Sequence, residues 1–145
     1  MSEKQDLLRP AAGCDSIFTL STRQKHYARP FEGQLCPIIS TKRAPSRMQL
    51  LANGGSVYWI INSRIQARQL ILGHEMVDDP AGGTRCHIYL DPALYRTQSY
   101  PQRAFQGWRY LDPTRIPPDI GLYEEGTEED IPPEMEADLR ELGLF

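Results

Sequence analysis

The sequence predicts an α+β domain built on a small, mostly antiparallel sheet or partly closed β-barrel, with one or two short helices and an acidic C-terminal tail. Residues 56–62 ("SVYWIIN") and 84–91 ("TRCHIYLD") are rich in β-branched, aromatic and alternating apolar residues, which is typical of strands. Residues 1–115 carry fifteen Lys and Arg against nine Asp and Glu, whereas residues 116–145 carry ten acids and only one base, Arg140. This asymmetry indicates a basic body followed by an acidic tail.

The chain has 145 residues, which suits one domain with its own core. We expect a flexible N-terminus at residues 1–12, a single domain at 13–115, and a proline-bearing acidic tail at 116–145 that ends in a short helix. No run of about 18 apolar residues occurs, and the charged N-terminus lacks the apolar stretch of a signal peptide. These features predict a cytoplasmic protein that does not enter a membrane.

The first third of the chain is expected to hold little regular structure. Residues 16–20 ("SIFTL") are compatible with a strand or a turn of helix, and the polar residues 21–34 read as a long loop because a proline and a glycine interrupt them. Residues 35–41 ("LCPIIST") are expected to form a short strand. Ser46 is a good N-cap for a short helix over "RMQLLA", which the "NGG" that follows would end.

Two long apolar segments are predicted to form a hairpin. Residues 65–77 fit a helix or a strand by periodicity, and Gly73 favours the strand. The turn "DDPAGG" then leads into residues 84–91. If the turn centres between its proline and alanine, Ile71 faces Leu90 and His74 faces His87. Two histidines are too few ligands for a metal, and the three cysteines show no ligand spacing, so neither a metal nor a cofactor is predicted.

The aromatic segment 102–111 ("QRAFQGWRYL") is predicted to be the last strand, because prolines follow and no sheet is expected beyond residue 116. Aromatic rings beside guanidinium groups can stack the bases of a single-stranded nucleic acid. We therefore predict stacking by Trp108 and Tyr110, beside the cations Arg103 and Arg109. Packing of Phe105 and Trp108 in the core is the alternative.

Two further groups of cations are candidate anion-binding residues. Lys42, Arg43 and Arg47 crowd the start of the predicted short helix, where an anion would offset their repulsion with the helix dipole. Arg64 and Arg68 would share one face of a strand and could read a phosphate or a carboxylate. Solvated side chains or ion pairs with neighbouring acids are the alternatives.

Several stretches resemble one family: "AGCDS", "RAPSRMQLLANGGS", "GGSVYWIINSRIQARQLIL", "RCHIYLDPALY" and "RAFQGWRYL". The chain is similar over roughly residues 12–120 to uncharacterised alphaproteobacterial proteins of about 140 residues that are grouped as a domain of unknown function. That resemblance implies no activity. The order of elements also resembles the small barrels of the PUA and ASCH type, which implies a PUA-like fold and RNA as a ligand.

The resulting prediction is a non-catalytic module that binds RNA or a nucleotide through a basic surface. A small enzyme acting on a nucleotide or nucleic acid is one alternative, with Glu75 or Asp91 as base. The other is a protein-interaction subunit that uses the tail and an apolar patch around Trp108 and Leu139. The acidic tail is expected to shield the cationic face in cis, to dock on a protein partner, or simply to remain solvated.

Overall fold

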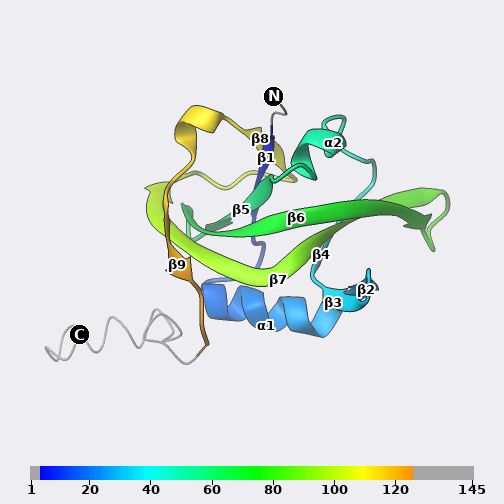
Figure 1. Ribbon diagram of the computed structural model, residues 1–145, viewed down its shortest axis with the longest axis horizontal. Helices are drawn as coiled ribbons and strands as arrows, with labels where there is room; N and C mark the ends of the chain where they lie inside the picture. The colour runs from blue at the N-terminus through cyan, green and yellow to red at the C-terminus, as the bar shows by residue number, and fades with distance from the viewer. Residues whose placement is uncertain (1–3, 126–145) are drawn as a thin grey trace, which may run out of the picture.

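The fold is one curled sheet with a helix against one of its faces (Figure 1). The computed structural model describes residues 4–125. Along the main sheet the strands follow the order β4 (Ile38–Thr41), β7 (Thr84–Pro101), β6 (Arg64–Asp78), β5 (Ser56–Ile61), β1 (Asp6–Pro10) and β8 (Arg109–Leu111), and β9 (Asp119–Leu122) also pairs with β7. All its pairings are antiparallel except that of β1 with β5. The predicted α+β class, with a mostly antiparallel and barrel-like sheet, is therefore confirmed.

Each face of the sheet carries its own apolar cluster. The helix face bears Leu7, Val57 and Trp59, which pack with residues of α1 (Ile17–Tyr27). The opposite face, which we call the loop face, bears Leu8, Tyr58 and Ile60, and Phe105 and Ile116 pack over them. Consecutive residues of one strand enter opposite clusters because side chains alternate across a strand.

Residues 6–10 form a strand inside the sheet, which corrects the prediction of a flexible segment at residues 1–12 for that part of the segment. Strand β1 (Asp6–Pro10) lies between β5 (Ser56–Ile61) and β8 (Arg109–Leu111). Leu7 and Leu8 are buried on opposite faces of the sheet. Only two apolar residues mark this strand, and its partners lie some fifty and one hundred residues away, so local periodicity could not reveal it.

Helix α1 replaces most of the loop predicted at residues 21–34. Ser16 caps it by accepting a hydrogen bond from the Thr19 backbone N–H at 3.1 Å. Ile17 and Leu20 are buried, and Lys25 and His26 lie in the last turn, where positive charge suits the helix dipole. Its apolar stripe is narrow, which explains why the polar composition of the segment suggested a loop.

A small hairpin follows α1 and packs onto the long strands. Strands β2 (Arg29–Phe31) and β3 (Gln34–Cys36) pair with each other, and β4 (Ile38–Thr41) joins β7 at the edge of the main sheet. Phe31 stacks on Tyr89 with ring centroids 4.2 Å apart. Gly73 makes room for Phe31, because a Cβ at that position would lie 3.1 Å from the ring.

The predicted short helix is present as α2 (Met48–Leu51), but its cap differs from the prediction. The Ser46 hydroxyl lies 3.2 Å from the Tyr110 hydroxyl and does not cap the helix. Gly55, just beyond the helix, is needed because a Cβ there would lie 2.0 Å from the Gln5 carbonyl oxygen.

The two longest strands are β6 (Arg64–Asp78) and β7 (Thr84–Pro101). Ile71 faces Leu90 as predicted, but a register shift between Ile71 and Gly73 changes every pair nearer the turn. His74 therefore lies opposite Ile88, so its predicted pairing with His87 is wrong. A bulge shifts the register by one residue, and sequence alternation cannot locate it.

The chain after β7 departs from the prediction in two ways. Within the predicted strand 102–111 only β8 is paired, and residues 102–108 form an irregular segment whose Phe105 packs against the loop-face cluster. Beyond the 3₁₀ turn η1 (Pro113–Arg115), residues 119–122 form β9 (Asp119–Leu122) against β7, so the sheet does continue past residue 116. The two prolines before Asp119 precede the ladder and cost it no hydrogen bond.

Strand β9 extends the sheet to residue 122, beyond the predicted boundary at residue 115. The predicted terminal helix and most of the acidic tail lie outside the described residues. Among helices of residues 4–125, none is long and apolar enough to cross a bilayer.

Candidate functional site

A cleft of about 310 Å³ lies on the helix face, where the curl of the sheet brings β1 and β4 to the same space beside α1. Strands β4 and β1 both line it although three strands separate them in the sheet order, so the sheet curls around the cleft. Helix α1 forms one wall. The lining comprises Arg9, Pro10, Ala11, Ala12, Leu20, Arg23, Gln24, Tyr27, Ile38, Ile39, Ser40 and Trp59.

Arg9 is the most unusual group in the cleft. It lies on β1 directly opposite Trp59 and is half-buried. Among the described residues, its guanidinium has no hydrogen bond and no ion pair, and burial lowers its pKa from the ordinary value. A partly desolvated cation without a counter-charge is unfavourable by itself, and an anion in the cleft would relieve that cost.

Arg23 supplies a second guanidinium from α1. Its Nη1 donates a hydrogen bond to the Ala12 carbonyl just beyond β1. Gly13 has a φ of +77°, and a Cβ there would lie 3.0 Å from Arg23 Nη2, so the loop leaves space for the arginine. The helix and the end of β1 thus hold Arg23 at the cleft wall.

A buried amide network fixes the floor of the cleft. The Trp59 indole N–H donates to Gln69 Oε1 at 3.1 Å, and Gln69 is fully buried. Gln69 and Gln24 exchange two side-chain hydrogen bonds of 2.7 and 2.8 Å, and Gln69 also donates to the Asp91 carbonyl at 3.0 Å. Every polar atom of the Gln69 amide is therefore used, which holds Trp59 in one orientation.

The chemistry of the lining favours binding over bond breaking. It offers two guanidinium groups, an indole, an amide and the ring of Tyr27, which is 58% exposed. None of the lining residues is a carboxylate, a histidine or a cysteine. Across residues 4–125 no group of three or more potential ligands gathers to hold a metal ion.

A family model described as "Protein of unknown function (DUF1489)" matches residues 7–145. The chain belongs to this family. No curated protein and no solved structure matches it. The matched region begins in β1 and therefore includes all the residues that line the cleft.

In the structure, the predicted anion-binding residues of the first group lie between the end of β4 and the start of α2: Lys42, Arg43 and Arg47. Lys42 and Arg43 are exposed. Arg47 turns toward β1 and β8: its Nη1 donates to Oε1 of Gln5, just before β1, at 2.8 Å, and its guanidinium lies 4.9 Å from the ring centre of Tyr110 in β8. Helix α2 is only four residues long, so it offers little dipole for an anion.

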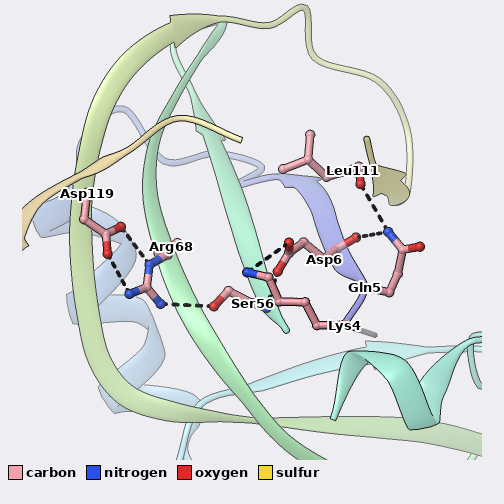
Figure 2. Close-up of polar contacts among 7 residues, drawn as sticks. All are labelled: Lys4, Gln5, Asp6, Ser56, Arg68, Leu111 and Asp119. Atoms are coloured by element: carbon pink, nitrogen blue, oxygen red, sulfur yellow. Dashed lines mark hydrogen bonds and ion pairs between the residues drawn. The ribbon is translucent and has the colours of Figure 1, made fainter. Parts of the chain in front are cut away.

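Arg68 lies on the loop face and is bound within the protein (Figure 2). Its Nε and Nη2 donate to the two carboxylate oxygens of Asp119 at 2.7 Å each, and its Nη1 donates to Ser56 Oγ at 3.2 Å. These bonds raise the pKa of Arg68 and lower that of Asp119. The other predicted cation of the stripe, Arg64, donates to Ser99 Oγ.

The polar chain continues from Ser56 across the loop face to β1 (Figure 2). The Ser56 backbone N–H donates to Asp6 Oδ1 at 2.8 Å, and Lys4 Nζ lies 3.6 Å from Asp6 Oδ2. Gln5 Nε2 donates to the Leu111 carbonyl at 3.1 Å. The chain of contacts thus joins β9, β6, β5, β1 and β8, which indicates a structural role.

The aromatic segment packs against both clusters. Phe105 is partly buried on the loop face, whereas Trp108 and Tyr110 are partly buried against the helix-face cluster. The ring centroids of Trp108 and Tyr110 lie 5.1 Å apart in an edge-on arrangement. Between Phe105 and Trp108 the backbone leaves strand geometry at Gly107, whose φ is +85°. Arg109 covers the Phe105 ring at 4.2 Å, and Arg103 is exposed. Stacking of a ligand on Trp108 or Tyr110 stays a prediction.

Sequence reasoning missed the cationic groups of the cleft, Arg9 and Arg23. One signal was present: in a strand, Arg9 shares a face with Leu7, which places an arginine among core residues. That signal is informative only once residues 6–10 are known to form a strand.

Proposed function

We propose that the protein is a cytoplasmic, non-catalytic module that binds RNA or a nucleotide, and that the cleft beside α1 receives one nucleotide. The observation that carries this proposal is Arg9, a half-buried guanidinium without a partner in the described part of the chain. Guanidinium groups bind phosphate oxygens through charge-assisted hydrogen bonds, which are stronger than neutral ones.

The rest of the lining suits the base of the same nucleotide. The exposed ring of Tyr27 can stack on a base, and the edge of Trp59 gives the cleft an apolar floor. Ser40 also lines the cleft, and the exposed Lys42 and Arg43 follow it by two and three residues. These cations extend the basic surface away from the cleft, where the backbone of a longer RNA would run.

The test compares two full-length variants that lose the same charge. Arg9→Gln removes the cleft cation, and Arg115→Gln removes an exposed cation of η1, outside the cleft lining. Binding of a fluorescein-labelled, single-stranded ten-nucleotide RNA is measured by anisotropy across a salt series, with AMP as competitor. Losing hydrogen bonds to a charged group costs about 1.5–3 kcal/mol, which is roughly a ten- to hundredfold weaker affinity for Arg9→Gln.

Arg115→Gln is expected to change the affinity no more than about twofold, because it removes only a remote charge. Thermal unfolding of both variants shows whether they remain folded. Equal weakening by both changes would place binding outside the cleft. Absence of binding by the wild-type protein at low salt would refute the proposal.

One observation favours the alternative of a small enzyme acting on a nucleotide. A second, polar pocket of about 320 Å³ on the loop face contains the carboxylate of Asp119 beside Arg68, together with Lys4 and the hydroxyl groups of Ser56 and Tyr58. The candidate bases Glu75 and Asp91 do not line it. Incubation of the protein with a set of nucleotides and short RNAs, analysed by liquid chromatography, separates the two functions, because only an enzyme generates a product that Tyr58→Phe or Arg68→Gln abolishes.

The alternative of a protein-interaction subunit gains no support of this kind. Trp108 is half-buried, and Leu139, the other centre of the predicted apolar patch, lies outside the described residues.

A further inference from the structure

The last described residues are held by β7 and by α1. Tyr123 is 8% exposed, and its backbone N–H donates to the Leu94 carbonyl at 2.8 Å. Two residues later, Glu125 Oε1 accepts a hydrogen bond from Ser21 Oγ at 3.2 Å and pairs with Lys25 Nζ. The acidic segment that follows therefore starts beside the helix that forms one wall of the cleft.

A surface path leads from Glu125 to the cleft. Ser21 and Lys25 line a shallow, mostly apolar hollow of about 210 Å³, together with Leu35, Pro37 and Pro92. Gln24 lines both this hollow and the cleft. The two depressions therefore meet along one side of α1, so a chain that leaves Glu125 needs to cross only the width of the helix to reach Arg23.

The sequence after Glu125 has the charge and the length for this path. Residues 126–145 contain seven Asp and Glu against a single arginine, and three of the acids are consecutive at Glu128, Glu129 and Asp130. An extended chain advances about 3.3 Å per residue, so the five residues from 126 to 130 span about 16 Å. This reach equals the whole length of α1, which has eleven residues, and therefore exceeds what is needed to cross the width of the helix. The family match also runs to residue 145 and thus includes this segment.

We propose that residues 126–145 occupy the cleft in cis, with Glu128, Glu129 and Asp130 against Arg9 and Arg23, and that a nucleotide ligand must displace them. The proposal rests on the proposed function for the identity of that ligand, but not for the contact itself. The tail supplies the counter-charge that Arg9 lacks among the described residues. Its tethering keeps its local concentration high, so it weakens anionic ligands without excluding them.

Two full-length variants with equal charge changes test the contact. In the first, Glu128→Gln, Glu129→Gln and Asp130→Asn neutralise the acids nearest Glu125. In the second, Glu134→Gln, Glu136→Gln and Asp138→Asn neutralise three acids further along the tail. The readout is the indole ¹H–¹⁵N NMR signal of Trp59, which lines the cleft, and Trp108 provides an internal reference outside the cleft lining.

The first variant is expected to shift the Trp59 signal, and the second variant is expected to leave it in place. The Trp108 signal is expected to stay unchanged in both. Addition of several hundred millimolar NaCl to the wild-type protein should move Trp59 in the direction of the first variant, because salt screens the contact. A Trp59 signal that responds equally to both variants, or to neither, would overturn the proposal.

RNA binding separates failure of this inference from failure of the proposed function. If both hold, the first variant binds the ten-nucleotide RNA about three- to tenfold more tightly than the second, because its cleft is free. If the Trp59 shift occurs but no RNA binds any variant, the tail contact stands and the proposed function fails. If RNA binding depends on Arg9 but the two tail variants bind equally and Trp59 does not move, the inference fails alone.

Discussion

Two arginines on opposite faces of the sheet show how differently the same side chain is used. Arg9 lies opposite Trp59 on the helix face, and Arg68 lies opposite Tyr58 on the loop face. Arg68 is bound to Asp119 and Ser56, whereas Arg9 has no polar partner in the described chain. Ion pairing raises the pKa of Arg68, and burial lowers that of Arg9. The difference separates a guanidinium bound within the fold from a half-buried one that has no counter-charge among residues 4–125.

The largest expected effect on stability comes from replacing Arg68 with methionine, and Arg9→Met is the matched comparison. Arg68→Met leaves Asp119 and Ser56 without their donor. Because Asp119 is 39% exposed, water replaces part of the loss, and we expect about 1–2 kcal/mol of destabilisation. In several hundred millimolar NaCl, which screens the proposed tail contact, Arg9→Met removes a half-buried cation that has no partner among residues 4–125, so the free energy of unfolding should change by less than about 0.5 kcal/mol or rise. Urea unfolding measures both, and equal losses would erase the distinction.

The pH dependence of stability sharpens the account of the loop face. The Arg68 guanidinium holds the pKa of Asp119 below its ordinary value of 3.8. A carboxyl with a lowered folded pKa contributes stability above its unfolded pKa, and the protein loses that contribution as the pH falls through the folded value. The stability difference between the wild type and Asp119→Asn should therefore be constant above about pH 5 and shrink below about pH 4. Urea unfolding between pH 7 and pH 3 measures it, and a difference that grows on acidification would contradict the pairing.

The elements of the fold differ in how far the sequence could predict them. The strand at 56–61 and the hairpin formed by β6 and β7 were predictable, because an unbroken apolar run and a strong turn signal are local features. Strands β1 and β9 and helix α1 depend on partners far along the chain. Arg68 and Asp119 are 51 residues apart, so no spacing rule could reveal their ion pair. The cleft could not be predicted either, because its lining residues come from β1, α1 and β4 and meet only in the folded sheet.

The cations predicted from the sequence differ in their contacts. Lys42 and Arg43 are exposed and follow Ser40, which lines the cleft, by two and three residues. Arg47 and Arg109 instead make cation–π contacts with the rings of Tyr110 and Phe105. Composition identifies the cations of a basic body, and only the tertiary contacts show which of them remain free.

The smallest expected effect concerns the neighbour of Arg68. Tyr58 is 3% exposed and its hydroxyl has no hydrogen bond within the described residues, while burial and the nearby Asp6 carboxylate raise its pKa to about 12. Tyr58→Phe should change stability near pH 7 by less than about 0.5 kcal/mol, whereas Tyr110→Phe should cost about 1 kcal/mol because that hydroxyl accepts from the Arg47 backbone N–H. An unfolded tyrosine ionises near pH 10, so above that pH the wild type should lose stability that Tyr58→Phe retains. A larger loss of stability for Tyr58→Phe than for Tyr110→Phe at pH 7 would contradict this expectation. It would mean that the Tyr58 hydroxyl makes a stabilising polar contact on the loop face.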